Sequence, residues 1–155
     1  MTRTNAREIV AHLLYGINYT KESADEAIVT RFAKDYYETL GSENDVYAER
    51  PNARQMEYIN SVVHGVEDHI EELDEYIAKY AIGWKLDRIS RLARSIMQLA
   101  MYEILYVGDV PTSAAINEAV ELTRKYEDED VVAFVNGILG SFARGAEETH
   151  EAEEK

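Results

Sequence analysis

The sequence predicts an all-α protein of about six or seven helices, and three kinds of pattern support this class. Apolar residues recur at spacings of three and four, which places them on one face of a helix. Alternating runs of β-branched residues, which would indicate strands, do not occur. Capping residues, glycines and prolines separate the periodic segments. A length of 155 residues with 46% hydrophobic content fits a single compact domain, which we expect over residues 1–144.

Three periodic segments occupy the first half of the chain. Residues 5–18 carry the first apolar stripe, which consists of Ile9, Val10, Leu13, Leu14 and Ile17. Ser23 and Glu26 have the spacing of a capping box, so a second helix is expected from residue 23 to about Gly41. Residues 41–51 are polar and indicate a loop. After the predicted cap at Asn52, the longest stripe follows, with Met56, Ile59, Val63, Val66, Ile70, Leu73 and Ile77.

This longest stripe has two interpretations. Its alternating steps of three and four residues would suit a coiled-coil seam as well as the buried face of an internal helix. Gly65 interrupts the stripe, and neighbouring helices need the same surface. The internal helix is therefore the preferred interpretation.

The second half of the chain predicts three more helices. Gly83 and Trp84 mark a break, after which the very apolar segment 89–106 is expected to be the central helix. Pro111 suits the first turn of the next helix, which is expected to end near residue 126. The last helix has Val131, Val135, Ile138 and Phe142 facing inward and is expected to end before Gly145. Residues 145–155 are predicted to form an acidic, disordered tail.

The composition bounds the location of the protein and the kind of partner it meets. No apolar run approaches the roughly 18–20 residues of a membrane span, and the first residues lack the apolar stretch of a signal peptide. A soluble cytoplasmic protein is expected. The net charge of −14 opposes non-specific binding of nucleic acid. Basic residues are concentrated in segments 1–21 and 79–94, and a polyanion should bind there.

Signs of catalytic, metal-binding or cofactor-binding residues are absent from the sequence. The histidines are never four residues apart, a spacing that would place two of them on one helix face, and cysteine ligands are lacking. Phosphate-binding glycine loops and nucleophile elbows do not occur. The carboxylates fall in runs that indicate a solvated face. We therefore expect an interaction module with no enzymatic activity, no metal site and no cofactor, in which most of the eleven tyrosines fill the edge of the core.

Three stretches of sequence identify a family. They are NAREIVAHLLY at residues 5–15, INEAVEL at residues 116–122 and FVNG at residues 134–137. In this order and spacing they resemble the NusB family of bacterial transcription antitermination factors. The resemblance covers essentially the whole chain apart from the acidic tail. Gln98 departs from the family pattern, in which arginine is common, and a change in an internal charge pair is expected there.

The resemblance implies a helical domain of two small bundles that binds rather than catalyses. Members of the family pair with a small-subunit ribosomal protein, also called NusE. The pair binds the boxA element of nascent RNA and helps RNA polymerase to read through terminators, notably in ribosomal RNA operons. The family's RNA and partner surface lies near the positions of Asp130 and Phe134, so both are candidate RNA-binding residues. Core packing is the alternative role for Phe134.

The residues themselves add a second candidate site at the N-terminus. Arg3 and Arg7 lie one helical turn apart at the start of the first helix, where backbone N–H groups and the helix dipole favour phosphate. Thr4 and Asn5 stand where further basic residues are common in the family. The acidic charge of the chain therefore favours a composite RNA surface, shared with the more basic ribosomal protein. The alternative is a helical protein–protein scaffold or a homodimer with little RNA binding of its own.

Overall fold

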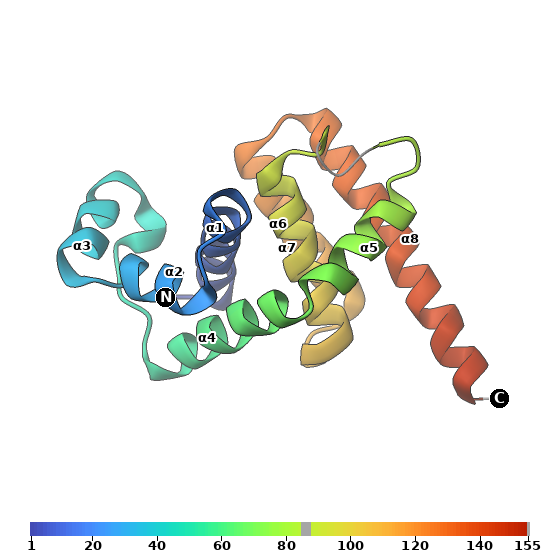
Figure 1. Ribbon diagram of the computed structural model, residues 1–155, viewed down its shortest axis with the longest axis horizontal. Helices are drawn as coiled ribbons and strands as arrows, with labels where there is room; N and C mark the ends of the chain where they lie inside the picture. The colour runs from blue at the N-terminus through green and yellow to red at the C-terminus, as the bar shows by residue number, and fades with distance from the viewer. Residues whose placement is uncertain (85–87, 155) are drawn as a thin grey trace. The chain divides into compact units, whose positions relative to one another are not determined.

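The computed structural model describes residues 1–84 and 88–154, and for residues 147–154 it describes the backbone alone (Figure 1). The described residues form eight α-helices and no strand, which confirms the predicted all-α class. They divide into two compact units, Met1–Asp68 and His69–Lys155. No helix in the described part of the chain is both long enough and apolar enough to cross a membrane. Each unit is built around its own set of helices.

The first unit contains four α-helices: α1 (Arg3–Thr20), α2 (Ala24–Arg31), α3 (Lys34–Glu43) and α4 (Ala53–Asp68). A 3-10 turn, η1 (Asp45–Tyr47), connects α3 to the segment before α4. Helix α1 packs against α2 and α4, because its predicted apolar stripe faces them. The fully buried residues of this core include Ile9, Leu13, Leu14, Ile59 and Val63.

The predicted second helix is in fact two helices, α2 and α3. The chain leaves the helical conformation at Phe32 and Ala33, although neither glycine nor proline stands there. The break lets the Phe32 ring stack on Tyr37, with ring centroids 5.5 Å apart. Tyr37 is buried, and its hydroxyl donates a hydrogen bond to the carbonyl of Glu49 at 2.6 Å. The break at Phe32 and Ala33 is thus accompanied by this ring contact and by the burial of Tyr37.

A buried phenol connects three elements of the first unit. The Tyr47 hydroxyl is 2.7 Å from Nδ1 of His12 and accepts a hydrogen bond from the Arg31 guanidinium at 2.9 Å. Burial raises the pKa of Tyr47 to about 12, and the nearby Arg31 charge opposes this shift. The phenol therefore stays protonated at neutral pH and ties η1 to α1 and α2.

Gly41 is required by a close approach between α3 and η1. A Cβ added at Gly41 would lie 2.7 Å from the carbonyl oxygen of Tyr47, whereas a Cβ at Gly137 in α8 would meet no atom within 4 Å. We expect Gly41→Ala to lower the free energy of unfolding by about 1 kcal/mol, because overpacking outweighs the gain in helix propensity. Gly137→Ala, the matched control, should raise it by about 1 kcal/mol. Urea unfolding of both variants checks the two signs, and a stabilised Gly41→Ala protein would contradict the packing argument.

The second unit contains α5 (Ile70–Tyr80), α6 (Arg91–Tyr102), α7 (Thr112–Tyr126) and α8 (Glu129–Glu154). A π-helical turn, η3 (Glu103–Val107), extends α6 and ends at Gly108, which has a positive φ of 71°. Helix α6 packs against α5, α7 and α8, so it is the central helix of this unit. The largest buried side chains here are Leu73, Ile77, Ile96, Met97, Met101, Leu139 and Phe142.

The longest predicted helix also divides in two, because α4 ends at Asp68 and α5 begins at Ile70. His69 stands at the break, where its ring stacks on Tyr106 with centroids 4.3 Å apart and its Nδ1 lies 3.1 Å from the Glu72 carboxylate. Most residues of the stripe are buried, with Ile59, Val63 and Val66 in the first unit and Leu73 and Ile77 in the second. This agrees with internal helices rather than with a continuous coiled-coil seam.

The last helix continues to Glu154, so the predicted end before Gly145 is wrong. Gly145 lies within the helix and makes room for a neighbour, since an added Cβ would collide with the hydroxyl of Tyr80 in α5. The segment beyond it is rich in alanine and glutamate and contains no proline, a composition that favours helix. The separate role of residues 145–155 as an acidic tail stays a prediction.

An acidic residue of α5 holds α6 through two partners. Asp74 accepts two hydrogen bonds from the Arg94 guanidinium, at 2.6 and 3.1 Å, and a third from the side-chain amide of Gln98 at 2.8 Å. Gln98 is fully buried. The residue that departs from the family pattern thus belongs to an internal charge cluster, as expected for that position.

Candidate nucleic-acid interface

Arg3 is the first residue of α1 and lies at the positive end of the helix dipole. Thr2 caps the helix, because its hydroxyl accepts a hydrogen bond from the N–H of Asn5 at 3.1 Å. The Arg3 guanidinium lies over the ring of Tyr58, 4.1 Å from the centroid, and the side chain is half-buried. This cation–π contact fixes the direction of the guanidinium while leaving part of it accessible.

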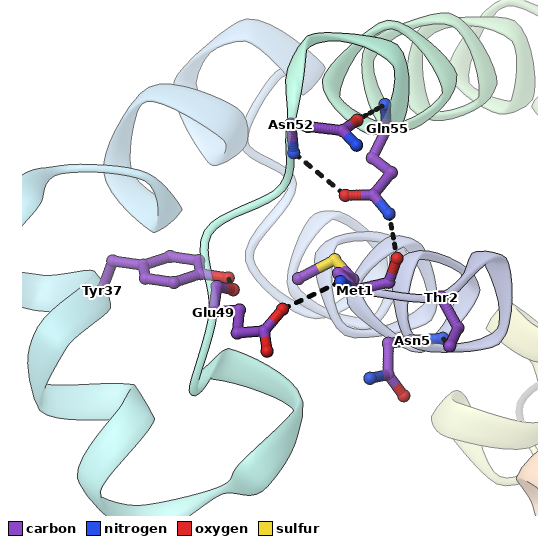
Figure 2. Close-up of polar contacts among 7 residues, drawn as sticks. All are labelled: Met1, Thr2, Asn5, Tyr37, Glu49, Asn52 and Gln55. Atoms are coloured by element: carbon purple, nitrogen blue, oxygen red, sulfur yellow. Dashed lines mark hydrogen bonds and ion pairs between the residues drawn. The ribbon is translucent and has the colours of Figure 1, made fainter.

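Polar contacts fix the start of α1 in place (Figure 2). Asn52 and Gln55 form a reciprocal capping box at the start of α4, with both hydrogen bonds at 2.9 Å. The side-chain amide of Gln55 also donates to the carbonyl of Met1. The ammonium group of Met1 lies 2.9 Å from the Glu49 carboxylate, and this hydrogen bond lowers the pKa of Glu49. The first turn of α1, with Arg3, is therefore anchored to α4 and to the segment before it.

Arg7 lies one turn further along α1, as predicted, but its side chain is buried and only 7% exposed. The next residue, Glu8, is also buried. A guanidinium with so little accessible surface has less room for a phosphate than that of Arg3. Its role in RNA binding stays a prediction.

Asp130 and Phe134 lie one turn apart in the first part of α8. Asp130 is exposed, and Phe134 is half-buried. The Phe134 ring meets the indole of Trp84 edge to face, with centroids 5.5 Å apart and an angle of 63° between the planes. Phe134 thus lies at the surface of the second unit, where one part of its ring packs against Trp84 and another part is accessible.

A cavity of about 150 Å³ opens beside these two rings. We call it the Trp84 pocket, and it is lined by Trp84, Arg88, Ile89, Ser90, Ala93, Asp130, Val131 and Phe134. Sequence reasoning singled out Asp130 and Phe134 but treated Trp84 only as a helix break. The signal that could have found Trp84 is a lone tryptophan beside a glycine, within the base-rich segment 79–94.

The base-rich segment presents several of its cations to solvent. Lys79, Arg88 and Arg91 are exposed, whereas Arg94 is engaged by Asp74. Lys85, which also contributed to the prediction, lies outside the described residues. The exposed arginines flank the Trp84 pocket and the start of α6. They provide positive charge locally on a chain whose net charge is −14.

Other aromatic and polar side chains are more exposed than expected. The tyrosines on the surface are Tyr15, Tyr19, Tyr36, Tyr106 and Tyr126. Tyr15 and Tyr19 stack on each other along α1, with centroids 6.2 Å apart. Asn117 and Asn136, the polar residues within the INEAVEL and FVNG motifs, are also exposed. Their place in the motifs is therefore not explained by core packing.

The predicted site residues fall into two pairs. Arg3 and Arg7 belong to the first unit, and Asp130 and Phe134 belong to the second. Each pair lies within one turn of a single helix. The structure thus gives two candidate contact regions, one at the start of α1 and one at the Trp84 pocket.

Comparison with known proteins identifies the family. The model of the NusB family matches residues 4–144. A transcription antitermination protein NusB from Acetivibrio thermocellus is 40% identical over 144 residues, which cover 93% of this chain and 90% of the relative. The corresponding protein from Ruminiclostridium cellulolyticum is 39% identical over 145 residues, with coverage of 94% and 90%.

Solved structures agree with the sequence comparison. NusB from T. maritima superposes with a TM-score of 0.77 at 25% identity, over 93% of this chain and 92% of that chain. A chain in a crystal structure of the antitermination factors NusB and NusE in complex with double-stranded RNA gives a TM-score of 0.73, again at 25% identity. That match covers 92% of this chain and 96% of the other. On the evidence of sequence and fold together, this chain belongs to the NusB family.

Proposed function

We propose that this protein is a transcription antitermination factor that pairs with the ribosomal protein NusE and binds boxA-type RNA in nascent transcripts. The observation that carries the proposal is the match, over 92% of the chain, to a structure solved with NusE and RNA. The relatives named as transcription antitermination proteins support the same role. The complex acts with RNA polymerase in the cytoplasm and supports transcription of ribosomal RNA operons. Its activity is binding, without catalytic turnover.

The acidic charge of the chain decides how RNA is held in this proposal. With a net charge of −14, the chain repels phosphates over most of its surface. Arg3 at the start of α1 and Arg88 beside the Trp84 pocket are local exceptions. A basic partner adds the remaining positive surface. We assign Arg3 as a phosphate contact, Arg7 as the second basic group at the same helix end, and Asp130 and Phe134 as RNA contacts on α8.

Assembly of the two proteins is tested by light scattering after size exclusion, with this chain alone, with the purified ribosomal protein, and with both. We expect a one-to-one complex that forms in the mixture without RNA. A stable dimer of this chain, unchanged by adding the ribosomal protein and indifferent to RNA, would instead support a homodimeric scaffold.

A further inference from the structure

Three aromatic side chains gather at the surface of the second unit. Tyr102 ends α6, Tyr106 lies in the π-helical turn η3, and His69 directly precedes α5. The His69 and Tyr106 rings stack with centroids 4.3 Å apart, and the Tyr102 ring lies 5.2 Å from that of Tyr106. Tyr106 is nevertheless 46% exposed. We call these three residues, together with Glu72, the Tyr106 cluster.

Glu72 places a carboxylate at the edge of these rings. The Tyr106 hydroxyl donates to both of its oxygens, at 2.8 and 3.0 Å, and Nδ1 of His69 lies 3.1 Å from one of them. The hydrogen bond to Glu72 raises the pKa of Tyr106 to about 12, so the phenol stays protonated at neutral pH and keeps the carboxylate in place. The Glu72 side chain is still 38% exposed. Since a carboxylate offers about four lone-pair sites, it can accept a further donor from outside.

The chain covers several other tyrosine rings with cations of its own. The pairs are Arg3 with Tyr58, Arg31 with Tyr47, Arg50 with Tyr37, Lys79 with Tyr80 and Lys125 with Tyr126. Within the part of the chain that the structure describes, no lysine or arginine lies over Tyr102 or Tyr106. These two rings, next to a carboxylate, therefore leave a place for a cation from another molecule.

We propose that the Tyr106 cluster binds an arginine side chain of a protein partner. A planar guanidinium can stack on an aromatic face and donate to a carboxylate at the same time, which suits this arrangement better than an ammonium group does. Glu71 and Glu75 are exposed on the same helix as Glu72, and their charges attract a basic protein segment and repel RNA phosphates. The π-helical turn that carries Tyr106 is a rare conformation that is frequent at functional sites.

This surface consists of residues other than the RNA contacts assigned above, so the inference does not depend on the proposed function. The experiment is an NMR titration of the full chain with the blocked tripeptide acetyl-Gly-Arg-Gly-amide. In a matched peptide, citrulline replaces arginine and keeps the shape of the side chain without its charge. The arginine peptide should shift the resonances of Tyr102, Tyr106 and Glu72. The citrulline peptide should bind about tenfold more weakly, because it loses the cation–π contact and the ion pair together.

Variants locate the site on the chain. Tyr106→Ala should weaken binding of the arginine peptide about two- to fivefold, the effect of one exposed cation–π contact, and Tyr106→Phe should keep most of the affinity because the ring remains. Glu72→Gln should weaken binding to a similar extent. Tyr126→Ala, the matched control, removes a tyrosine of similar exposure whose ring is already covered by Lys125. Glu38→Gln removes the same charge as Glu72→Gln from an exposed position in α3, and both controls should bind like the wild type.

Three results would overturn the inference. The first is equal affinity for the arginine and citrulline peptides. The second is an effect of Tyr106→Ala no larger than that of Tyr126→Ala. The third is weaker RNA binding by the complex that contains Tyr106→Ala while its ribosomal partner stays bound, because the ring would then serve RNA. The peptide titration contains neither RNA nor ribosomal protein, so its failure leaves the proposed function in place. Failure of the wild-type complex to bind RNA would remove the proposed function and leave this inference.

Discussion

Replacing Asp74 with alanine should lower the free energy of unfolding by about 1.5 to 3 kcal/mol, the net contribution of a hydrogen bond to a charged group, because its ion pair is partly buried. The Asp74 carboxylate receives three hydrogen bonds, two from Arg94 and one from Gln98. The side chains of Asp74 and Arg94 are only 17% and 23% exposed, and Gln98 is fully buried. Without the carboxylate, the buried Gln98 amide loses a hydrogen bond, and the Arg94 charge loses its neutralising group.

Two variants make this expectation specific. Glu75→Ala removes an exposed carboxylate from the same helix and should change the stability by less than about 0.5 kcal/mol. In a Gln98→Met background, the loss caused by Asp74→Ala should be smaller, because the hydrogen bond between Gln98 and Asp74 is already absent. Denaturant unfolding of the wild type, the three single variants and the double variant measures these differences. Equal effects of Asp74→Ala and Glu75→Ala would contradict the assigned role.

Replacing Arg3 with alanine should weaken RNA binding by the complex about tenfold or more. A hydrogen bond to a charged group contributes about 1.5 to 3 kcal/mol, and one is lost with the guanidinium. The slope of log affinity against log salt concentration should also fall by about 0.7, the value for one phosphate contact on a single strand. Titrations at several salt concentrations measure both quantities.

Lys34→Ala is the matched control for Arg3→Ala. Lys34 is an exposed cation of α3 in the same unit, and its replacement changes the net charge equally. Its salt slope should equal that of the wild type. Arg7→Ala tests the predicted second contact: a slope reduced by about 0.7 supports it, whereas an unchanged slope assigns this buried side chain to the fold. An unchanged slope in Arg3→Ala would remove Arg3 from the RNA surface.

The helical class and most helix positions could be predicted because the sequence carries regular apolar stripes. The stripes of α1 and α8 fell on faces that the structure buries, and Ser23 does cap α2, with its hydroxyl accepting from the N–H of Glu26. The breaks at Phe32 and His69 could not be predicted. Neither glycine nor proline marks them, and the ring contacts found there, Phe32 with Tyr37 and His69 with Tyr106, are not encoded in the apolar pattern.

The candidate site was predictable in part for the same reason. Arg3, Arg7, Asp130 and Phe134 could be named from local motifs and from the resemblance to the family. The burial of Arg7 could not be predicted, because a basic residue in the first turns of a helix is usually solvated. Trp84 is 50 residues away from Phe134 in the chain, and its edge-to-face contact is a property of the folded unit. Gly145 shows the same limit. In the sequence this glycine indicates a helix end, whereas in the structure it packs against Tyr80.

We propose that RNA is held by a surface shared between this acidic chain and a basic ribosomal partner. Equilibrium titration of boxA-type RNA, with this chain alone and with the purified ribosomal protein added, tests it most directly. We expect weak, salt-sensitive binding by the chain alone and much tighter binding by the two proteins together. Tight, salt-insensitive binding by the chain alone, or no binding when both proteins are present, would contradict it.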